Sequence, residues 1–179
     1  NSIIRSVLLK LKENSAIVIK DRINKKSFKE VMEFRKTGGY WLNALEKMPY
    51  KSTKIELIKF ENSVEKDFCI LLINSSLFYV YWSTYGNLRD FPLSLLEKFP
   101  FPQLEILNKN RVKIEKLREN ISKCLLSSFI ADTGRVGEFR TATCKNVIND
   151  IDQFLGEIYG LNKKEIEFIE KYDNHIRKS

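Results

Sequence analysis

The spacing of hydrophobic and polar positions changes along the chain, and each change predicts an element. Residues 31–35 and 54–60 show the short, partly alternating pattern of strands. A turn is expected at 36–39, because its paired glycines accept positive φ without steric cost. Residues 64–82 are apolar over too long a run for one strand, so they predict a single, largely buried helix. Residues 3–11 fit a helix or a strand equally well.

The second half of the chain follows a helical period. Pro100 and Pro102 cannot lie inside a helix, so the chain must change direction there. Residues 104–129 then predict one long helix with a single apolar stripe. The stripe is formed by Leu107, Ile114, Leu117, Ile121 and Cys124. After a loop at 131–137, residues 138–144 are expected to be extended.

The last 35 or so residues predict a pair of helices. The apolar positions between Val147 and Ile158 share one helical face, and Gly160 supplies the left-handed residue that ends many helices. Asn162 and Glu165 have the spacing of a capping box, which marks the start of the next helix. Two helices joined in this way are expected to pack as a hairpin.

These elements predict an α+β fold in two regions. Residues 1–102 are expected to form a small mixed or antiparallel sheet with packed helices, and residues 103–179 a helical region that ends in the helix hairpin. With 179 residues, 43% of them hydrophobic, the chain is long enough to bury a core and is too apolar for a disordered class. Because it begins at Asn1 rather than Met, we expect it to be a fragment of a longer protein.

The positive charge is concentrated near the start of the chain. The net charge is +8, from 31 basic and 23 acidic side chains. Residues 1–60 hold 14 basic and 6 acidic side chains, whereas the remainder holds 17 of each. Such asymmetry favours a surface that faces a polyanion, with Lys and Arg neutralising phosphates. An ordinary soluble domain with an uneven surface is the alternative.

The cysteines and the apolar runs point to a soluble protein. Cys69, Cys124 and Cys144 are widely spaced, and His175 is the one histidine, so the sequence lacks the ligand pattern of a structural zinc site. We expect reduced, buried thiols in a cytoplasmic protein. The longest apolar run, residues 68–82, contains polar positions and is too short to span a membrane.

The sequence contains no recognisable catalytic motif. It has no P-loop, no glycine-rich cofactor loop, no Asn/Asp-Pro-Pro-Tyr/Phe motif and no acidic-x-Lys triplet of the kind common in metal-dependent endonucleases. The acidic pairs Asp150/Asp152 and Glu165/Glu167 lie two residues apart on helices, so their side chains diverge and are expected to face solvent. These observations favour a binding segment over a catalytic one.

Several strings resemble the C-terminal part of adenine-specific DNA methyltransferases of restriction–modification systems, including fused enzymes that both cut and methylate. The strings are residues 34–41, 71–82, 90–102, 145–152, 158–161 and 168–173. The resemblance implies a target recognition domain that reads bases and holds duplex DNA while the catalytic domain of the same chain methylates a flipped adenine. It assigns S-adenosylmethionine to that domain, with Mg²⁺ as well if the parent enzyme also cleaves DNA. Residues 1–30 lie outside the resemblance.

The candidate DNA-contacting residues combine cations, polar groups and aromatic rings beside turns. An Arg suits the two acceptors of guanine, and a Lys suits a phosphate. The candidates are Arg35, Lys36, Thr37, Gly38, Tyr40, Trp41, Lys51, Lys54, Asn87, Arg89, Arg135 and Arg140. For the two aromatic residues, a place in the core is the alternative, and for the lysines a solvated loop.

Two other functions stay open on the sequence alone. The prolines before the helix at 104–129 also suit a DNA specificity subunit of a multi-subunit restriction system. A non-DNA interaction module is the third possibility, in which Ile114, Leu117 and Ile121 would meet a partner helix. The base sequence that would be read is not derivable from one chain.

Overall fold

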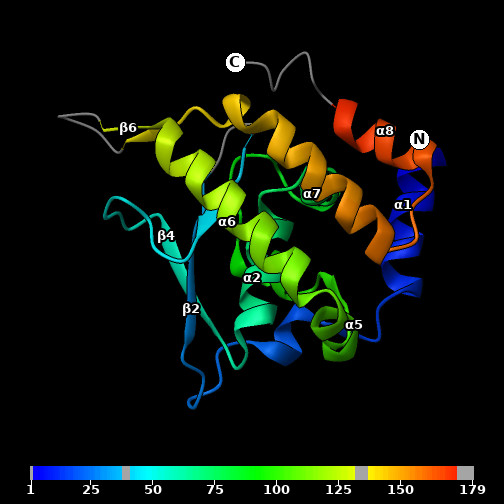
Figure 1. Ribbon diagram of the computed structural model, residues 1–179, viewed down its shortest axis with the longest axis horizontal. Coiled ribbons are helices and arrows are strands. Elements are labelled where there is room, and N and C mark those ends of the chain that lie inside the picture. The colour runs from blue at the N-terminus through cyan, green and yellow to red at the C-terminus, as the bar shows by residue number, and fades with distance from the viewer. Residues whose placement is uncertain (1, 38–40, 132–136, 173–179) are drawn as a thin grey trace.

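The computed structural model describes residues 2–37, 41–131 and 137–172. Its strands are β1 (Ile17–Val18), β2 (Glu30–Arg35), β3 (Ala44–Leu45), β4 (Ile55–Phe60), β5 (Pro100–Phe101), β6 (Phe129–Ile130) and β7 (Glu138–Phe139). Its α-helices are α1 (Ser2–Glu13), α2 (Ser63–Ile73), α3 (Ser76–Tyr85), α4 (Leu93–Glu97), α5 (Leu104–Lys109), α6 (Arg111–Ser128), α7 (Lys145–Ile158) and α8 (Lys163–Lys171). The short 3₁₀ helices are η1 (Ile19–Arg22) and η2 (Thr141–Cys144). This mixture of small antiparallel sheets and packed helices confirms the predicted fold class (Figure 1).

The main sheet has β2 at its centre, with β3 and β4 antiparallel on either side. Met32 and Phe34 of β2, and Ile58 and Phe60 of β4, are fully buried, so one face of the sheet covers the core. Both predicted strands are confirmed to within a residue at each end. The two-residue strand β3 was not predicted, because it is too short to show a period.

The predicted single helix at 64–82 is wrong in one respect, since two helices, α2 and α3, meet at Asn74 and Ser75. The Asn74 side chain accepts a hydrogen bond from the Ala44 N–H at 3.2 Å and donates one to the Ala44 carbonyl at 2.8 Å. Ser75 caps α3 by accepting from the Phe78 N–H at 3.0 Å. These polar side chains end one helix, start the next and bind the junction to β3.

The predicted helix at 104–129 is divided as well. It breaks at Asn110, whose φ of −106° and ψ of 10° are not helical and whose side chain donates to the Ile106 carbonyl at 2.9 Å. Residues 138–144 were expected to be extended, but only β7 is; the chain then tightens into η2. The bend is held by Thr141, whose buried hydroxyl accepts a hydrogen bond from Asn43 at 3.1 Å.

The helix hairpin at the C-terminal side is confirmed. Gly160 ends α7 with φ +66°, and Asn162 and Glu165 form both bonds of the predicted capping box. The segment around residues 3–11, left open between helix and strand, is the helix α1. It lies against α8, where Glu165 accepts hydrogen bonds from Ser6 at 2.6 Å and Lys10 at 2.7 Å (Figure 1).

Two acidic residues expected to face solvent are buried instead. Asp152 is 0% exposed, and its Oδ1 accepts from the backbone N–H groups of Ser76 at 2.8 Å and Leu77 at 3.2 Å, at the start of α3. Glu165 is 3% exposed within the contact between α1 and α8. The spacing argument failed because it considered each helix alone, and neighbouring helices cover both positions.

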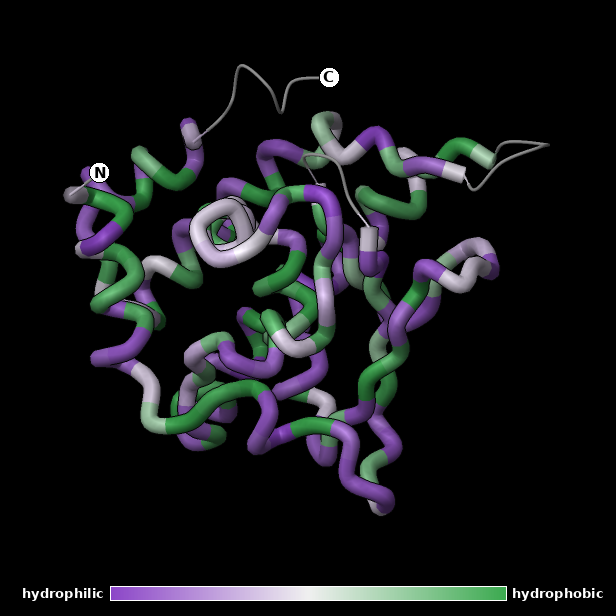
Figure 2. The backbone as a smooth tube through the Cα atoms, turned by 180° about the vertical axis from the view of Figure 1, so that it is seen from behind, coloured by the Kyte–Doolittle hydropathy of each residue, from purple (hydrophilic) through white to green (hydrophobic). Residues whose placement is uncertain are grey.

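One core runs through both predicted regions. The Phe68 ring packs against those of Phe101, Phe154 and Tyr159, and the Tyr159 hydroxyl donates to the Pro100 carbonyl at 3.0 Å. The same core contains Ile114, Leu117 and Ile121, which are therefore not available to a partner helix. The turns that extend from the sheet are hydrophilic (Figure 2). Within the described ranges, no helix has both the length and the apolar character needed to cross a membrane.

Candidate nucleic-acid interface

The candidate surface is organised by the main chain that leaves the C-terminal end of β2. The Lys36 N–H donates to the Lys54 carbonyl at 2.7 Å, and the Lys36 carbonyl accepts from the Phe91 N–H at 2.6 Å. Thr37 forms an isolated antiparallel bridge with Asp90. The structure thus brings together three segments that the sequence analysis had selected separately, namely the end of β2, the turn before β4 and the loop before α4.

The side chains of this surface are mostly exposed cations. Lys51, Lys54 and Arg89 are exposed, whereas Lys36 is partly exposed and lies 3.3 Å from Glu56 Oε2 in an ion pair. In the turn before β4, the Ser52 hydroxyl accepts from the Lys54 N–H at 3.1 Å and fixes the backbone there. Such cations in a defined backbone setting suit phosphate oxygens.

Asn87 has a structural part in this surface that the sequence analysis did not foresee. Its Oδ1 accepts from the N–H groups of Arg89 at 3.0 Å and Asp90 at 2.8 Å, so this oxygen shapes the loop. The loop also holds Leu88 at φ +57°. Arg89 is thereby presented on a defined turn, and only the amide nitrogen of Asn87 is left for a base edge.

Arg35 lies beside a group of aromatic side chains. The Tyr50 ring stacks on Phe129 at 5.6 Å between centroids with an interplanar angle of 8°, and it also packs near Phe139. Burial raises the pKa of the Tyr50 hydroxyl, and the nearby positive charge of Arg35 partly opposes that shift. Within the described residues, neither the Tyr50 hydroxyl nor the buried Arg35 Nε has a hydrogen-bond partner. Sequence reasoning missed these aromatic residues, since they show no shared spacing.

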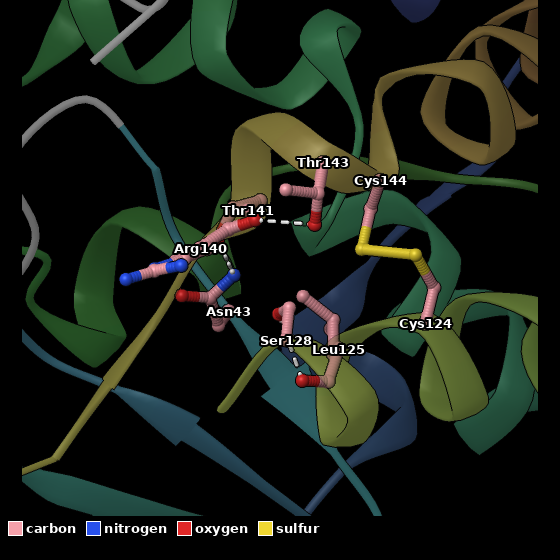
Figure 3. The surroundings of a disulfide bond; sticks show 8 residues. All are labelled: Asn43, Cys124, Leu125, Ser128, Arg140, Thr141, Thr143 and Cys144. Carbon is pink, nitrogen blue, oxygen red and sulfur yellow. Dashed lines mark hydrogen bonds between the residues drawn. A yellow bond between two sulfur atoms is a disulfide. The ribbon is translucent and has the colours of Figure 1, made fainter. Parts of the chain in front are cut away.

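Another described candidate, Arg140, directly follows β7 of the strand pair β6–β7. This residue is exposed, and its N–H donates to the Ser128 carbonyl at 3.1 Å across the base of the pair. Asn43 lies just before β3, and its bond to Thr141 fastens that base to the sheet (Figure 3). The β6–β7 pair and the turn before β4 extend from the same side of the molecule (Figure 1).

Three candidates lie outside the described residues, and several of the other predicted or basic residues have structural contacts instead. Gly38, Tyr40 and Arg135 lie outside the described residues. Trp41 is half-buried and packs against the core, which supports the anchoring alternative for that residue. Among the early basic residues, Lys10 pairs with Glu165 and Arg22 with Glu65, so both stabilise the fold.

Exposed lysines lie at both ends of the sheet. Lys25 and Lys26 are exposed in the turn before β2, which lies at the opposite end of the sheet from Lys54 (Figure 1). Lys25 lies over the Phe28 ring, with its Nζ 5.7 Å from the ring centroid. The excess positive charge is therefore not gathered on a single surface.

The expectation of reduced thiols is wrong for two of the cysteines. Cys124 near the end of α6 and Cys144 at the end of η2 form a disulfide, with their Cα atoms 5.8 Å apart (Figure 3). The two cysteines are 20 positions apart in the sequence, which gave no sign of this proximity; it results from packing of η2 against α6. Cys69 is a free, buried thiol as expected, and burial raises its pKa.

The surface described here combines exposed cations with a few carboxylates. Across residues 2–37, 41–131 and 137–172, no cluster of His, Cys, Asp and Glu side chains could hold a metal ion. The exposed groups are lysines and arginines, accompanied by the carboxylates of Glu56 and Asp90. Comparison of the chain with protein-family models, curated proteins and solved structures found no match.

Proposed function

We propose that this chain is a target recognition domain that binds double-stranded DNA sequence-specifically, in an adenine-specific DNA methyltransferase of a restriction–modification system. The observation that carries the proposal is the double anchoring of Lys36, whose N–H and carbonyl tie the turn before β4 and the loop before α4 to the end of β2. Cations from separate segments are thereby held on one surface, as a rigid phosphate backbone requires.

In this proposal, phosphate contacts and base contacts come from different parts of the surface. Lys51, Lys54 and Arg89 are exposed and would neutralise phosphates, together with Arg140 beside the β6–β7 pair. Arg35 is partly buried and its charge acts on Tyr50, and its guanidinium would make the bidentate contact to guanine. A catalytic domain of the same chain would bind S-adenosylmethionine and the flipped adenine, and the whole enzyme would work in the cytoplasm.

The test is a salt titration of binding to duplex DNA, followed by fluorescence anisotropy. The logarithm of the binding constant should fall linearly with the logarithm of salt concentration, with a slope of about −0.9 per phosphate contact. The double variant K51Q/K54Q should reduce the magnitude of that slope by about 2 if both lysines contact phosphates.

The matched control is K163Q/K164Q, which removes two exposed lysines from the start of α8, away from the sheet (Figure 1). It should leave both the affinity and the slope as they are in the wild type. Absence of duplex binding at low salt, or an equal effect of the two double variants, contradicts the proposal. A library of randomised duplexes then identifies the bases that are read.

A further inference from the structure

The disulfide lies at the base of the β6–β7 strand pair. Cys124 precedes β6 within the last turns of α6, and Cys144 follows β7 at the end of η2. The bond therefore closes a loop that contains both strands and the exposed Arg140 (Figure 3). Any effect of the bond on Arg140 would act through this loop.

The strand pair has little stability of its own. Its ladder consists of two residue pairs, Phe129 with Phe139 and Ile130 with Glu138, and a two-stranded ribbon is marginally stable in water. Gly137 faces Phe129 so closely that a Cβ there would meet the ring and lie 2.7 Å from the Ile130 carbonyl oxygen. Such close packing in so short a ladder benefits from a restraint that holds its two ends together.

The strand pair is also joined to the candidate DNA surface. Phe129 and Phe139 pack on Tyr50, which immediately precedes Lys51. At the base, Asn43 donates to the buried Thr141 hydroxyl, three residues before Cys144. These contacts connect the segment closed by the disulfide to the turn before β4.

We propose that the Cys124–Cys144 disulfide regulates DNA binding, so that the oxidised protein binds duplex DNA more tightly than the reduced protein. This inference rests on the proposed function of the surface. A disulfide in a protein of a reducing compartment is characteristically transient and redox-sensing, which suits a regulatory bond. In the chain-entropy description, closing a loop of this length disfavours the unfolded chain by a factor on the order of a hundred. Because only part of the surface depends on that loop, we expect the affinity for DNA to fall by about fivefold on reduction.

A dithiol reductant supplies the two electrons that open the disulfide. Its thiolate attacks one sulfur of the disulfide, the other cysteine leaves as a thiolate and takes up a proton, and a mixed disulfide forms. The second thiol of the reductant then attacks the mixed disulfide, frees the remaining cysteine and closes its own disulfide. Two electrons and two protons pass to Cys124 and Cys144. Cys124 is partly exposed whereas Cys144 is buried, so we expect the reductant to attack at Cys124.

The experiment measures duplex affinity by anisotropy for the oxidised protein, for the same protein treated with dithiothreitol, and for C124A/C144A. Amide hydrogen exchange in residues 125–143 provides a second measurement, with the β2 amides as an internal reference. We expect reduction to weaken binding about fivefold and to speed exchange in residues 125–143 but not in β2. The double variant should bind like the reduced protein and should not respond to dithiothreitol.

A circular dichroism melt establishes that the double variant is folded, and C69A, which retains the disulfide, is the control for loss of a thiol. Equal, measurable affinities in the oxidised and reduced wild type overturn this inference and leave the proposed function intact. Absence of binding in both states overturns the proposed function itself, and this inference falls with it. The two failures are therefore distinguishable in one titration.

Discussion

Asp152 connects α7 to the start of α3, and its removal should be costly. Its Oδ1 accepts from the Ser76 and Leu77 N–H groups, and the residue is 0% exposed. In D152A those buried donors lose a charged acceptor at a helix N-terminus, which costs about 3 kcal/mol. Urea denaturation followed by circular dichroism measures the change in the free energy of unfolding. The matched control is D150A, two residues earlier and exposed, which should change stability by less than about 0.5 kcal/mol. Equal effects of the two variants would contradict this role for Asp152.

Glu165 makes the contact between α1 and α8 dependent on pH. Burial raises the pKa of its carboxyl, but hydrogen bonds from Lys10, Ser6 and the Asn162 N–H outweigh burial, and the net shift is downward from 4.5. A carboxyl with a lowered pKa stabilises the fold above its unfolded-state pKa, and this stabilisation is lost as the pH falls through the folded-state pKa. We therefore expect the free energy of unfolding to decrease below about pH 4.5.

The variant E165Q should be less stable at neutral pH and should show a flatter pH profile in the acid range. Urea titrations at a series of pH values give both quantities. The control is E167Q, since Glu167 is paired more weakly, with Lys163 Nζ at 4.0 Å. If the acid branches of wild type and E165Q coincide, Glu165 is not the group responsible.

At the scale of elements, the link between α7 and α8 depends on the conformation of Gly160. Its φ is +66°, and the Leu161 N–H donates to the Gly156 carbonyl at 2.8 Å across the helix end. A Cβ at Gly160 would be 3.4 Å from Asn14 Nδ2, so space is sufficient and the cost comes from φ. G160A should therefore destabilise the protein by about 1–2 kcal/mol, and G160N by less, because Asn tolerates this conformation better. Thermal melts that rank the two variants in the opposite order would count against this explanation.

Sequence periodicity predicted the elements that bury one regular face. It found β2, β4, α7 and α8, and the Gly160 and Asn162 signals placed the helix ends correctly. It failed at Asn74 and Asn110, where a helix break depends on a side chain bonding to a backbone carbonyl. For Asn74, that carbonyl belongs to β3, thirty residues away. The Asn74 contact has no local pattern in one sequence, and the Asn110 bond to the Ile106 carbonyl, four residues earlier, leaves the hydrophobic period unchanged.

The cations of the candidate surface could be predicted from the sequence, but the contacts that hold their segments in place could not. Turn residues and charges selected Lys36, Lys54 and Arg89 from the sequence, and the structure brings their segments together. The aromatic packing of Tyr50 and the disulfide between Cys124 and Cys144 each join residues that are distant in sequence. No sequence motif marks either contact. Long-range packing decided these features, which explains why the reduced-thiol prediction failed.

For the molecule as a whole, the shared core predicts cooperative unfolding. Phe68 lies before Pro102 in the chain, and its ring packs on Phe154 and Tyr159 from the helical region. We expect the full chain to unfold in a single transition, with coincident near- and far-ultraviolet circular dichroism curves. A fragment of residues 1–102 should not fold alone, because it would expose that apolar surface. A fragment with dispersed amide resonances in an NMR spectrum would show instead that the two predicted regions are independent.

The packing of α1 against α8 also decides how the molecule is best attached to a probe. Ile3 and Tyr172 line the same shallow hollow of about 520 Å³, on the side away from the turn before β4 (Figure 1). A fluorophore or an immobilising tag placed beside either residue would leave the basic turns pointing into solution. The same orientation would let a sensor chip or an optical-trap handle hold the protein while the opposite end remains accessible to a long, stiff polymer.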